Sequence, residues 1–450
     1  MKLQIERQNF LKSWQIAEKV ANIRSTKEAL TAVLITASDD GTVTLESTDM
    51  KSYVKCKAEG VSILETGSAL ANASILGNMM RKYSTDEIEL EFNRERGLLK
   101  ADGSRTRVTG IPTEIFPNVP NSKDAELICE ISASELARII SEGSSASSQP
   151  QDFPKYMGTS LMRTEEGIIK VISTDGRRLS VSKCYCSPNK IEEDLLLASP
   201  ALKELGRTMS SYGEDKVSIM AESSMVWFIL QDIEFAIRRI ESNFPNYERI
   251  LNDQKNTILR IDCNELSRAL DRIDIIAKTT MAHIMAMALQ PTGEIRITAR
   301  APELGTVSEN LFAQVEGGYL QLGFNVGYFQ DGLKALGPGE IVIEFSGEEE
   351  QTRMYRAGKD DFLYMLMPAR LSQQDAMTEE EISDFRRNSQ VQQDYQAPVQ
   401  EEYNPESEYQ EPSQEYNPEQ AYQEPSQDYN SEQNYQEPSQ EQYNPEQNNY

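Results

Sequence analysis

The sequence predicts an α+β fold made of three copies of one unit, each with two helices packed on antiparallel sheet, followed by a disordered C-terminal tail. Two repeated motifs carry this prediction. Phe116-Pro117-Asn118-Val119 recurs as Phe244-Pro245-Asn246-Tyr247, and Ser47-Thr48-Asp49 recurs at a nearly equal offset as Ser173-Thr174-Asp175. A constant offset of about 125 residues indicates an internal repeat of ordinary domain size.

Each unit is expected to open with a short strand and an amphipathic helix. In the second unit, Ser132 and Glu135 form a capping box at the start of this helix, and Gly143 ends it. The apolar helix faces consist of Phe10, Trp14, Ala17 and Ala21 in the first unit, Leu136, Ile139 and Ile140 in the second, and Leu266, Leu270, Ile273 and Ala277 in the third.

A second helix is expected midway through each unit, and an alternating strand follows it. N-cap chemistry is present near Asn72, at Ser199-Pro200 and at Asn325. Strands with period-two alternation are predicted at 87–92, 216–219 and 340–345. Three such units can pair their sheet edges in series, and ring closure through oligomerisation would cover the edges that remain at the two ends.

The predicted domains are residues 1–122, 123–253 and 254–371, and the tail is 372–450. The formal charge of the chain is −27, but the tail holds about 19 acids and two bases, so the body is only mildly acidic. Tyr-Gln-Glu-Pro-Ser-Gln occurs three times in the tail with a period of about 13 residues. Its Pro, Gln and Glu content excludes a packed core.

Composition predicts a cytoplasmic protein. Five scattered cysteines fit a reducing compartment better than a disulfide framework, and Cys184-Tyr185-Cys186 alone is a poor zinc signal. The N-terminus has no apolar signal segment, and no apolar run is long enough to span a bilayer. No metal or cofactor is expected, and the single histidine, His283, lies in an apolar setting typical of a packed side chain.

The run Tyr364-Met365-Leu366-Met367-Pro368-Ala369-Arg370-Leu371 marks the end of the folded body. Pro368 cannot donate to a sheet ladder, so we interpret this run as a last strand that leaves the sheet with some side chains exposed for a partner. The alternative is an ordinary core strand.

Four motifs in this order resemble those of the bacterial replicative sliding clamps, the beta subunit of DNA polymerase III holoenzyme: Thr174–Leu179, Phe244–Leu251, Gly323–Leu336 and Tyr364–Leu371. The resemblance covers about residues 1–371. It implies a head-to-tail homodimeric ring around double-stranded DNA, with helices lining the hole and no enzymatic activity. It also implies three kinds of partner: the DNA polymerase III alpha subunit, the clamp loader, and other proteins with a clamp-binding motif.

The resemblance places a partner-peptide cleft between the second and third domains. Methionine packs adaptably against varied peptides, and arginine donates to peptide carbonyls or acids. Arg177 stands where the family commonly has His, and Ala369 is smaller than usual, so the partner preference is expected to shift. The cleft wall implied by the motifs consists of Met157, Thr174, Gly176, Arg177, Arg178, Leu179, Pro245, Arg249, Ile250, Met365, Leu366, Met367, Pro368, Ala369 and Arg370.

Basic residues on or beside the predicted helices suit a channel that contacts phosphates without reading bases. The alternative for each of them is an ordinary solvated helix face. By family position, Arg24, Gln151 and Tyr156 are expected to contact DNA. The other candidates are Lys12, Arg81, Lys203, Arg207, Arg268 and Arg272.

The resemblance also implies a subunit interface. It would join the strand that contains Arg105, Thr106, Arg107 and Val108 in the first domain to Ile275 and Ile276 in the third. Thr106 is less apolar than such a contact favours, so dimer strength stays open.

Three roles for the tail and two other protein classes stay open. The tail could be a solubilising spacer, a set of tyrosine-based binding sites, or a competitor that folds Ile382 and Phe385 back into the cleft. An enzyme would need a clustered catalytic site, yet no nucleophile elbow or phosphate-binding glycine loop is present. A clamp-fold scaffold, or a specialised paralogue outside bulk replication, would use the tail as its interaction element.

Overall fold

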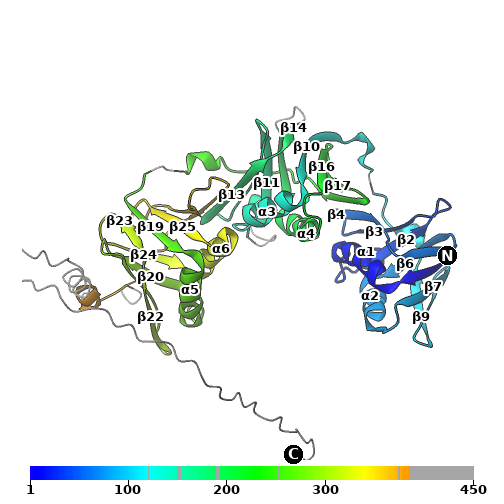
Figure 1. Ribbon diagram of the computed structural model, residues 1–450, viewed down its shortest axis with the longest axis horizontal. Coiled ribbons are helices and arrows are strands. Elements are labelled where there is room, and N and C mark those ends of the chain that lie inside the picture. The colour runs from blue at the N-terminus through cyan, green and yellow to red at the C-terminus, as the bar shows by residue number, and fades with distance from the viewer. Residues whose placement is uncertain are drawn as a thin grey trace, which may run out of the picture. The chain divides into compact units, whose positions relative to one another are not determined.

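The chain is described by a computed structural model (Figure 1). The described residues are 1–119, 121–148, 154–188, 193–251, 254–372, 376–378 and 380–385. All of them belong to one compact unit.

The predicted threefold repeat is present as three pairs of helices. The two helices of each pair pack against each other, as Figure 1 shows. The pairs are α1 (Arg7–Val20) with α2 (Ala73–Lys82), α3 (Ala133–Gly143) with α4 (Ser199–Met209), and α5 (Cys263–Ala277) with α6 (Val326–Leu336).

The strand edges of the first and second repeats join in one fourteen-stranded sheet. The junction is the antiparallel pair β18–β4, in which Ile233 lies opposite Cys56 and Phe235 opposite Val54. The spatial order is β14 (Ser187–Pro188), β10 (Glu126–Ser132), β16 (Lys216–Ala221), β17 (Met225–Leu230), β18 (Ile233–Arg238), β4 (Ser52–Lys57), β3 (Val43–Thr48), β2 (Ala32–Ala37), β6 (Gly67–Asn72), β9 (Ser104–Ile111), β8 (Arg96–Ala101), β7 (Glu87–Asn93), β1 (Lys2–Glu6) and β5 (Val61–Glu65).

The second and third repeats join in the same way. The antiparallel pair β13–β27 completes a nine-stranded sheet, so the predicted edge-to-edge pairing in series is confirmed at both junctions. That sheet has the order β15 (Glu193–Ala198), β11 (Thr159–Glu165), β12 (Ile168–Thr174), β13 (Arg178–Tyr185), β27 (Phe362–Leu366), β26 (Thr352–Arg356), β25 (Glu340–Phe345), β19 (Thr257–Asp262) and β23 (Gln314–Glu316). A four-stranded sheet has the order β22 (Gly305–Phe312), β21 (Glu294–Ala301), β20 (Ile284–Leu289) and β24 (Leu320–Asn325).

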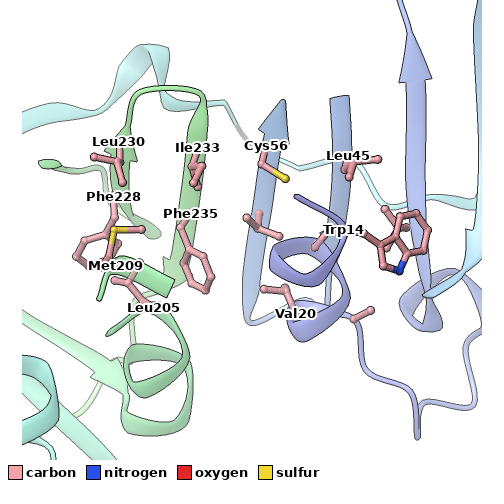
Figure 2. Packing of buried hydrophobic residues seen from close by; sticks show 14 of the residues in the cluster. Trp14, Val20, Leu45, Cys56, Leu205, Met209, Phe228, Leu230, Ile233 and Phe235 are labelled. Atoms are coloured by element: carbon pink, nitrogen blue, oxygen red, sulfur yellow. The ribbon is translucent and has the colours of Figure 1, made fainter. Parts of the chain in front are cut away.

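The core runs through the first junction without a break. Figure 2 shows side chains of β17, β18 and α4 on one side of it, and of β4, β3 and α1 on the other. Trp14 is fully buried, and its indole Nε1 donates to the Ala73 carbonyl at 3.2 Å, so helix α1 is tied to the start of α2. The labelled side chains are Leu205, Met209, Phe228, Leu230, Ile233 and Phe235 in the second repeat, and Trp14, Val20, Leu45 and Cys56 in the first.

Two of the three predicted caps of the second helices are confirmed. The Asn72 and Asn325 side chains each accept from a backbone N–H three residues on, at 3.0 Å in both cases. The predicted helix start at Ser199-Pro200 is confirmed, because α4 begins at Ser199 with Pro200 in its first turn, but Ser199 makes no cap. Its hydroxyl instead lies 2.8 Å from the Ser160 hydroxyl in the core.

Gly143 ends helix α3 as predicted, but packing is the reason. Ser144 after it has φ −96°, so the helix does not end in a left-handed residue. A Cβ at Gly143 would overlap the Val171 carbonyl of β12. The glycine therefore lets α3 approach the sheet closely.

Candidate partner cleft and cationic surface

The turn between β12 and β13 is shaped by the side chains of the Thr-Asp-Gly motif. The Thr174 hydroxyl donates to the Arg178 carbonyl at 2.6 Å and accepts from the Gly176 N–H at 3.0 Å. The Asp175 carboxylate accepts from the N–H groups of Arg177 and Arg178 at 3.0 and 3.2 Å. Gly176 has φ +85°, a conformation that favours glycine. Thr174 is therefore buried inside the turn, and Arg177 is exposed on it.

The Met/Leu run divides its side chains between two cores and the surface. In the β13–β27 pair, Leu179 lies opposite Met365, and both are buried in a small cluster of their own. Leu366 packs into the core of the third repeat. Met367 is 37% exposed, and its N–H donates to the Arg177 carbonyl at 2.9 Å. The run is therefore an ordinary core strand up to Leu366 and leaves the sheet at Met367. The Met367 side chain is the one in this stretch that is open to a partner.

Arg178 is one of the side chains that link the second and third repeats. Its guanidinium is buried and donates to Asp175 at 2.9 Å and to Asp331 of α6 at 2.6 Å. It also donates to the Tyr364 hydroxyl at 3.2 Å and lies 4.2 Å from the centre of the Tyr328 ring. Burial raises the pKa of Tyr364. Because the guanidinium is buried and its Nε and Nη1 donate to side chains of this chain, Arg178 supports the cleft wall from behind.

The opposite side of the cleft comes from two short 3₁₀ segments, η4 (Lys155–Gly158) and η5 (Tyr247–Arg249). A side chain at Gly176 would touch Met157 Cε at 3.4 Å, so Met157 closes over the turn. Tyr156 packs edge-on against Phe244 with ring centres 6.0 Å apart. The Tyr156 ring therefore packs against the Phe-Pro-Asn motif of the cleft.

A groove of about 1060 Å³ runs beside this wall. Leu161, Leu196 and Pro245 contribute its apolar part. Arg163 lines it too and forms a two-point ion pair with Asp194 at 2.6 and 2.8 Å. Most of its lining is polar or charged, so the groove adds hydrogen-bonding and charged groups beside the apolar cluster that contains Leu179 and Met365.

The candidate DNA-contacting cations lie on or beside helices, but they differ in how free they are. Among the described residues, Lys12, Arg24 and Arg268 form no ion pair with an acid. Lys203 donates to the Ser147 hydroxyl at 3.1 Å, and burial together with the nearby Arg178 lowers its pKa. The remaining cations pair with acids: Arg81 with Glu18, Arg207 with Glu204, and Arg272 with Glu309. Gln151 lies outside the described residues.

Three family models match the chain one after another, with almost no gap. They are the N-terminal, central and C-terminal domains of the DNA polymerase III beta subunit, at residues 1–120, 130–246 and 248–370. The chain belongs to the DNA polymerase III beta subunit family. The order and number of the matched domains agree with the three repeats seen in the structure.

Known members of the family are similar to this chain over their whole length. The beta sliding clamp of Staphylococcus aureus is 26% identical over 382 residues, which cover 82% of this chain and 99% of the relative. The crystal structure of the DNA polymerase III subunit beta from Pseudomonas aeruginosa is 25% identical with a TM-score of 0.75, covering 82% and 100% of the two chains. The Bacillus subtilis sliding clamp superposes with a TM-score of 0.76 at 22% identity, covering 83% and 100%.

The beta-subunit motifs named from sequence meet at the β13–β27 junction. Four of their residues do not face the cleft. Thr174, Arg178 and Leu366 are buried behind the wall, and Arg370 points to solvent, where it pairs with Glu349. Sequence reasoning missed the floor of the cleft, where Leu179 and Met365 pack with other side chains. These are Leu161, Ile172, Leu196 and Tyr247, with Phe244 partly buried beside them.

Of the residues assigned to the subunit interface, Arg105, Thr106, Arg107 and Val108 lie on β9, whereas Ile275 and Ile276 lie on helix α5. In the described chain, β9 pairs with β6 only at Gly110 and Ile111, so its outer edge is free from Ser104 to Thr109. Among the described strands, β22 pairs only with β21. Ile275 is 58% exposed, whereas Ile276 packs partly into the third core. The Thr106 hydroxyl is 2.9 Å from the Tyr83 hydroxyl.

The extension beyond Leu371 begins with a packed segment. Phe385 is fully buried against Ala288, with Met377 and Ile382 in the same cluster. Arg300 donates to the Ala376 carbonyl at 2.8 Å, and Arg296 lies 4.6 Å from the centre of the Phe385 ring. The alternative in which Ile382 and Phe385 fold back into the cleft is therefore wrong, because both side chains pack with Ala288 of β20 on the four-stranded sheet. The tyrosine repeats lie outside the described residues.

The described residues contain neither a membrane-spanning helix nor a cluster of metal-binding side chains. No described helix is long and apolar enough to cross a membrane. Within the same ranges, no group of three or more His, Cys, Asp or Glu side chains is arranged to hold a metal ion.

Proposed function

We propose that this chain is a DNA sliding clamp: a processivity factor that encircles duplex DNA as a homodimeric ring and tethers the replicative polymerase. The observation that carries the proposal is the match of all three beta-subunit domains, in order, over residues 1–370. The cleft built from Met157, Leu179 and Met367 would take apolar peptide segments of the polymerase alpha subunit, the clamp loader and other clamp-binding proteins.

Holding DNA in this way needs no reaction, so we propose that the protein is not an enzyme. Lys12, Arg24 and Arg268, which have no acidic partner in the described chain, would contact phosphates without reading bases. Each helix buries one face and turns the other to solvent, so cations on the outer faces can follow a moving duplex. The open edges of β9 and β22 would pair between copies in a head-to-tail dimer.

The decisive test is topological. A clamp loaded on nicked circular DNA should stay bound at salt concentrations that release ordinary cationic contacts, and it should be lost once the circle is cut. A scaffold that only shares the fold would not be retained on the circle. Equal retention on circular and linear DNA would contradict encirclement.

Leu179→Ala combined with Met367→Ala is expected to weaken binding of an apolar polymerase peptide by about 100-fold while the dimer stays intact. The variant removes one buried and one exposed apolar side chain from the same wall, and two such contacts contribute about 2–3 kcal/mol together. Peptide affinity by calorimetry and dimer mass by light scattering test both halves of the prediction.

The matched control is Leu205→Ala combined with Met281→Ala. Leu205 is fully buried in the second repeat and Met281 is fully exposed, so the control makes the same two chemical changes away from the cleft. An equal loss of affinity in the control would mean general destabilisation and would count against the cleft.

A further inference from the structure

An apolar pocket, which we call the first-repeat pocket, lies on the surface of the first repeat. It measures about 470 Å³. Met50 and Ile115 on its rim are 47% and 49% exposed, and they line the same pocket, so they form an exposed apolar patch. The pocket is lined by Lys27, Glu28, Ala29, Leu30, Met50, Ile115 and Pro117.

The turn beside this pocket repeats the turn of the partner cleft bond for bond. The Thr48 hydroxyl donates to the Ser52 carbonyl at 2.7 Å and accepts from the Met50 N–H at 3.0 Å. The Asp49 carboxylate accepts from the N–H groups of Lys51 and Ser52 at 2.9 and 2.7 Å. Met50, with φ +73°, takes the place that Gly176 has in the cleft.

The other walls correspond as well. The 3₁₀ segment η1 (Glu28–Thr31) stands where η4 stands in the cleft, and Pro117 belongs to the same Phe-Pro-Asn motif as Pro245. The strand that leaves the next repeat is held in the same way: the Arg238 N–H donates to the Lys51 carbonyl at 2.7 Å, and the Met367 N–H donates to the Arg177 carbonyl at 2.9 Å.

One change of residue gives the first-repeat pocket its own chemistry. Arg238 occupies the position of Met367, so a cation replaces an apolar side chain at the rim. Lys27, Lys51 and Arg238 are exposed, and none of them forms an ion pair with an acid in the described part of the chain. Glu28 is the acid among the lining residues. Asp49 in the turn and Glu114 next to Ile115 add acids nearby, so the surroundings of the pocket carry both signs. Arg238 Nε donates to the Met50 carbonyl at 3.3 Å, and Lys51 and Arg238 are the cations beside Met50 that have no acidic partner among the described residues.

We propose that the first-repeat pocket is a second peptide-binding site, and that it takes an extended segment of another protein in which a bulky apolar side chain follows an acid. The apolar side chain would fill the space between Met50, Ile115 and Leu30, and the acid would face Lys51 and Arg238. This goes beyond the proposed clamp function, since one cleft per chain already suffices for tethering.

Methionine-methyl NMR of the full chain tests the proposal, because each site has its own methionine. Met50 reports on the first-repeat pocket, and Met157 and Met367 report on the cleft. The probe is acetyl-Glu-Leu-Phe-amide, with acetyl-Gln-Leu-Phe-amide as the uncharged match. We expect the Met50 signal to shift to saturation, with the Glu peptide binding about threefold to fivefold more tightly than the Gln peptide, the range for one exposed ion pair.

Ile115→Glu should abolish the Met50 shift and leave the Met367 shift in place, because it blocks one pocket only. A Met50 signal that stays fixed while Met367 saturates would overturn the proposal, as would an unchanged Met50 shift in the variant. A Met50 signal that changes with protein concentration alone, or on removal of residues 386–450, would assign the pocket to a second copy or to the chain's own extension, and would overturn the peptide assignment.

Discussion

Replacing Arg178 by Met is expected to lower the free energy of opening of the β13–β27 junction by about 3–5 kcal/mol, the usual cost of removing one partner from a buried ion pair. The substitution keeps the length of the side chain but leaves Asp175 without its ion-pair partner, and the Asp175 carboxylate is as buried as the guanidinium that it binds. It also removes the donor to Asp331 and Tyr364, so one side-chain link between the second and third repeats is lost, while the ion pair between Arg356 and Glu142 remains. Native-state hydrogen exchange of the β27 amides measures the change.

Arg177→Met is the matched control, since the neighbouring arginine is exposed on the same turn. It should change the opening free energy by less than about 0.5 kcal/mol. Adding Asp175→Asn to Arg178→Met should restore part of the loss, because Asn still accepts from the turn but carries no buried charge. Equal effects of Met at positions 177 and 178 would show that the guanidinium network does not hold the junction.

The turn motifs show how far sequence reasoning reaches. Ser-Thr-Asp is a local signal: its hydroxyl and carboxylate bond to backbone groups within four residues, so both copies form the same turn in different repeats. The helix caps at Asn72 and Asn325 are local in the same sense. Such features could be predicted because the interacting groups are neighbours in the chain.

The floor of the cleft and the start of the extension could not be predicted in this way. Tyr247 and Leu161 meet Met365 only because β27 joins the sheet of the second repeat, which sequence periodicity does not specify. Phe385 sits in a segment whose composition argues against packing, and its partners Ala288 and Arg296 lie far away along the chain. A few apolar side chains are enough to order a segment when they pack on a sheet face that has already formed.

Arg105→Glu combined with Arg107→Glu is expected to weaken the homodimer by about 100-fold or more, measured by sedimentation equilibrium. Both arginines are exposed on the free edge of β9. The strand proposed to face them, β22, carries Glu309, which also pairs with Arg272, and the exposed apolar side chains of Phe312 at its end and Leu304 just before it. Reversing two charges would place acid against acid along an interface strand, and like charges at an interface cost several kcal/mol.

Lys57→Glu combined with Lys359→Glu makes the same net change of four charges at exposed lysines on other elements, and should leave the dimer unchanged. Raising the salt concentration should restore part of the lost affinity in the arginine variant, because the repulsion between exposed charges is screened. A dimer that forms equally well in both variants would place the interface elsewhere. The free edge of β9 would then need another partner, since an unpaired strand edge of this length invites pairing.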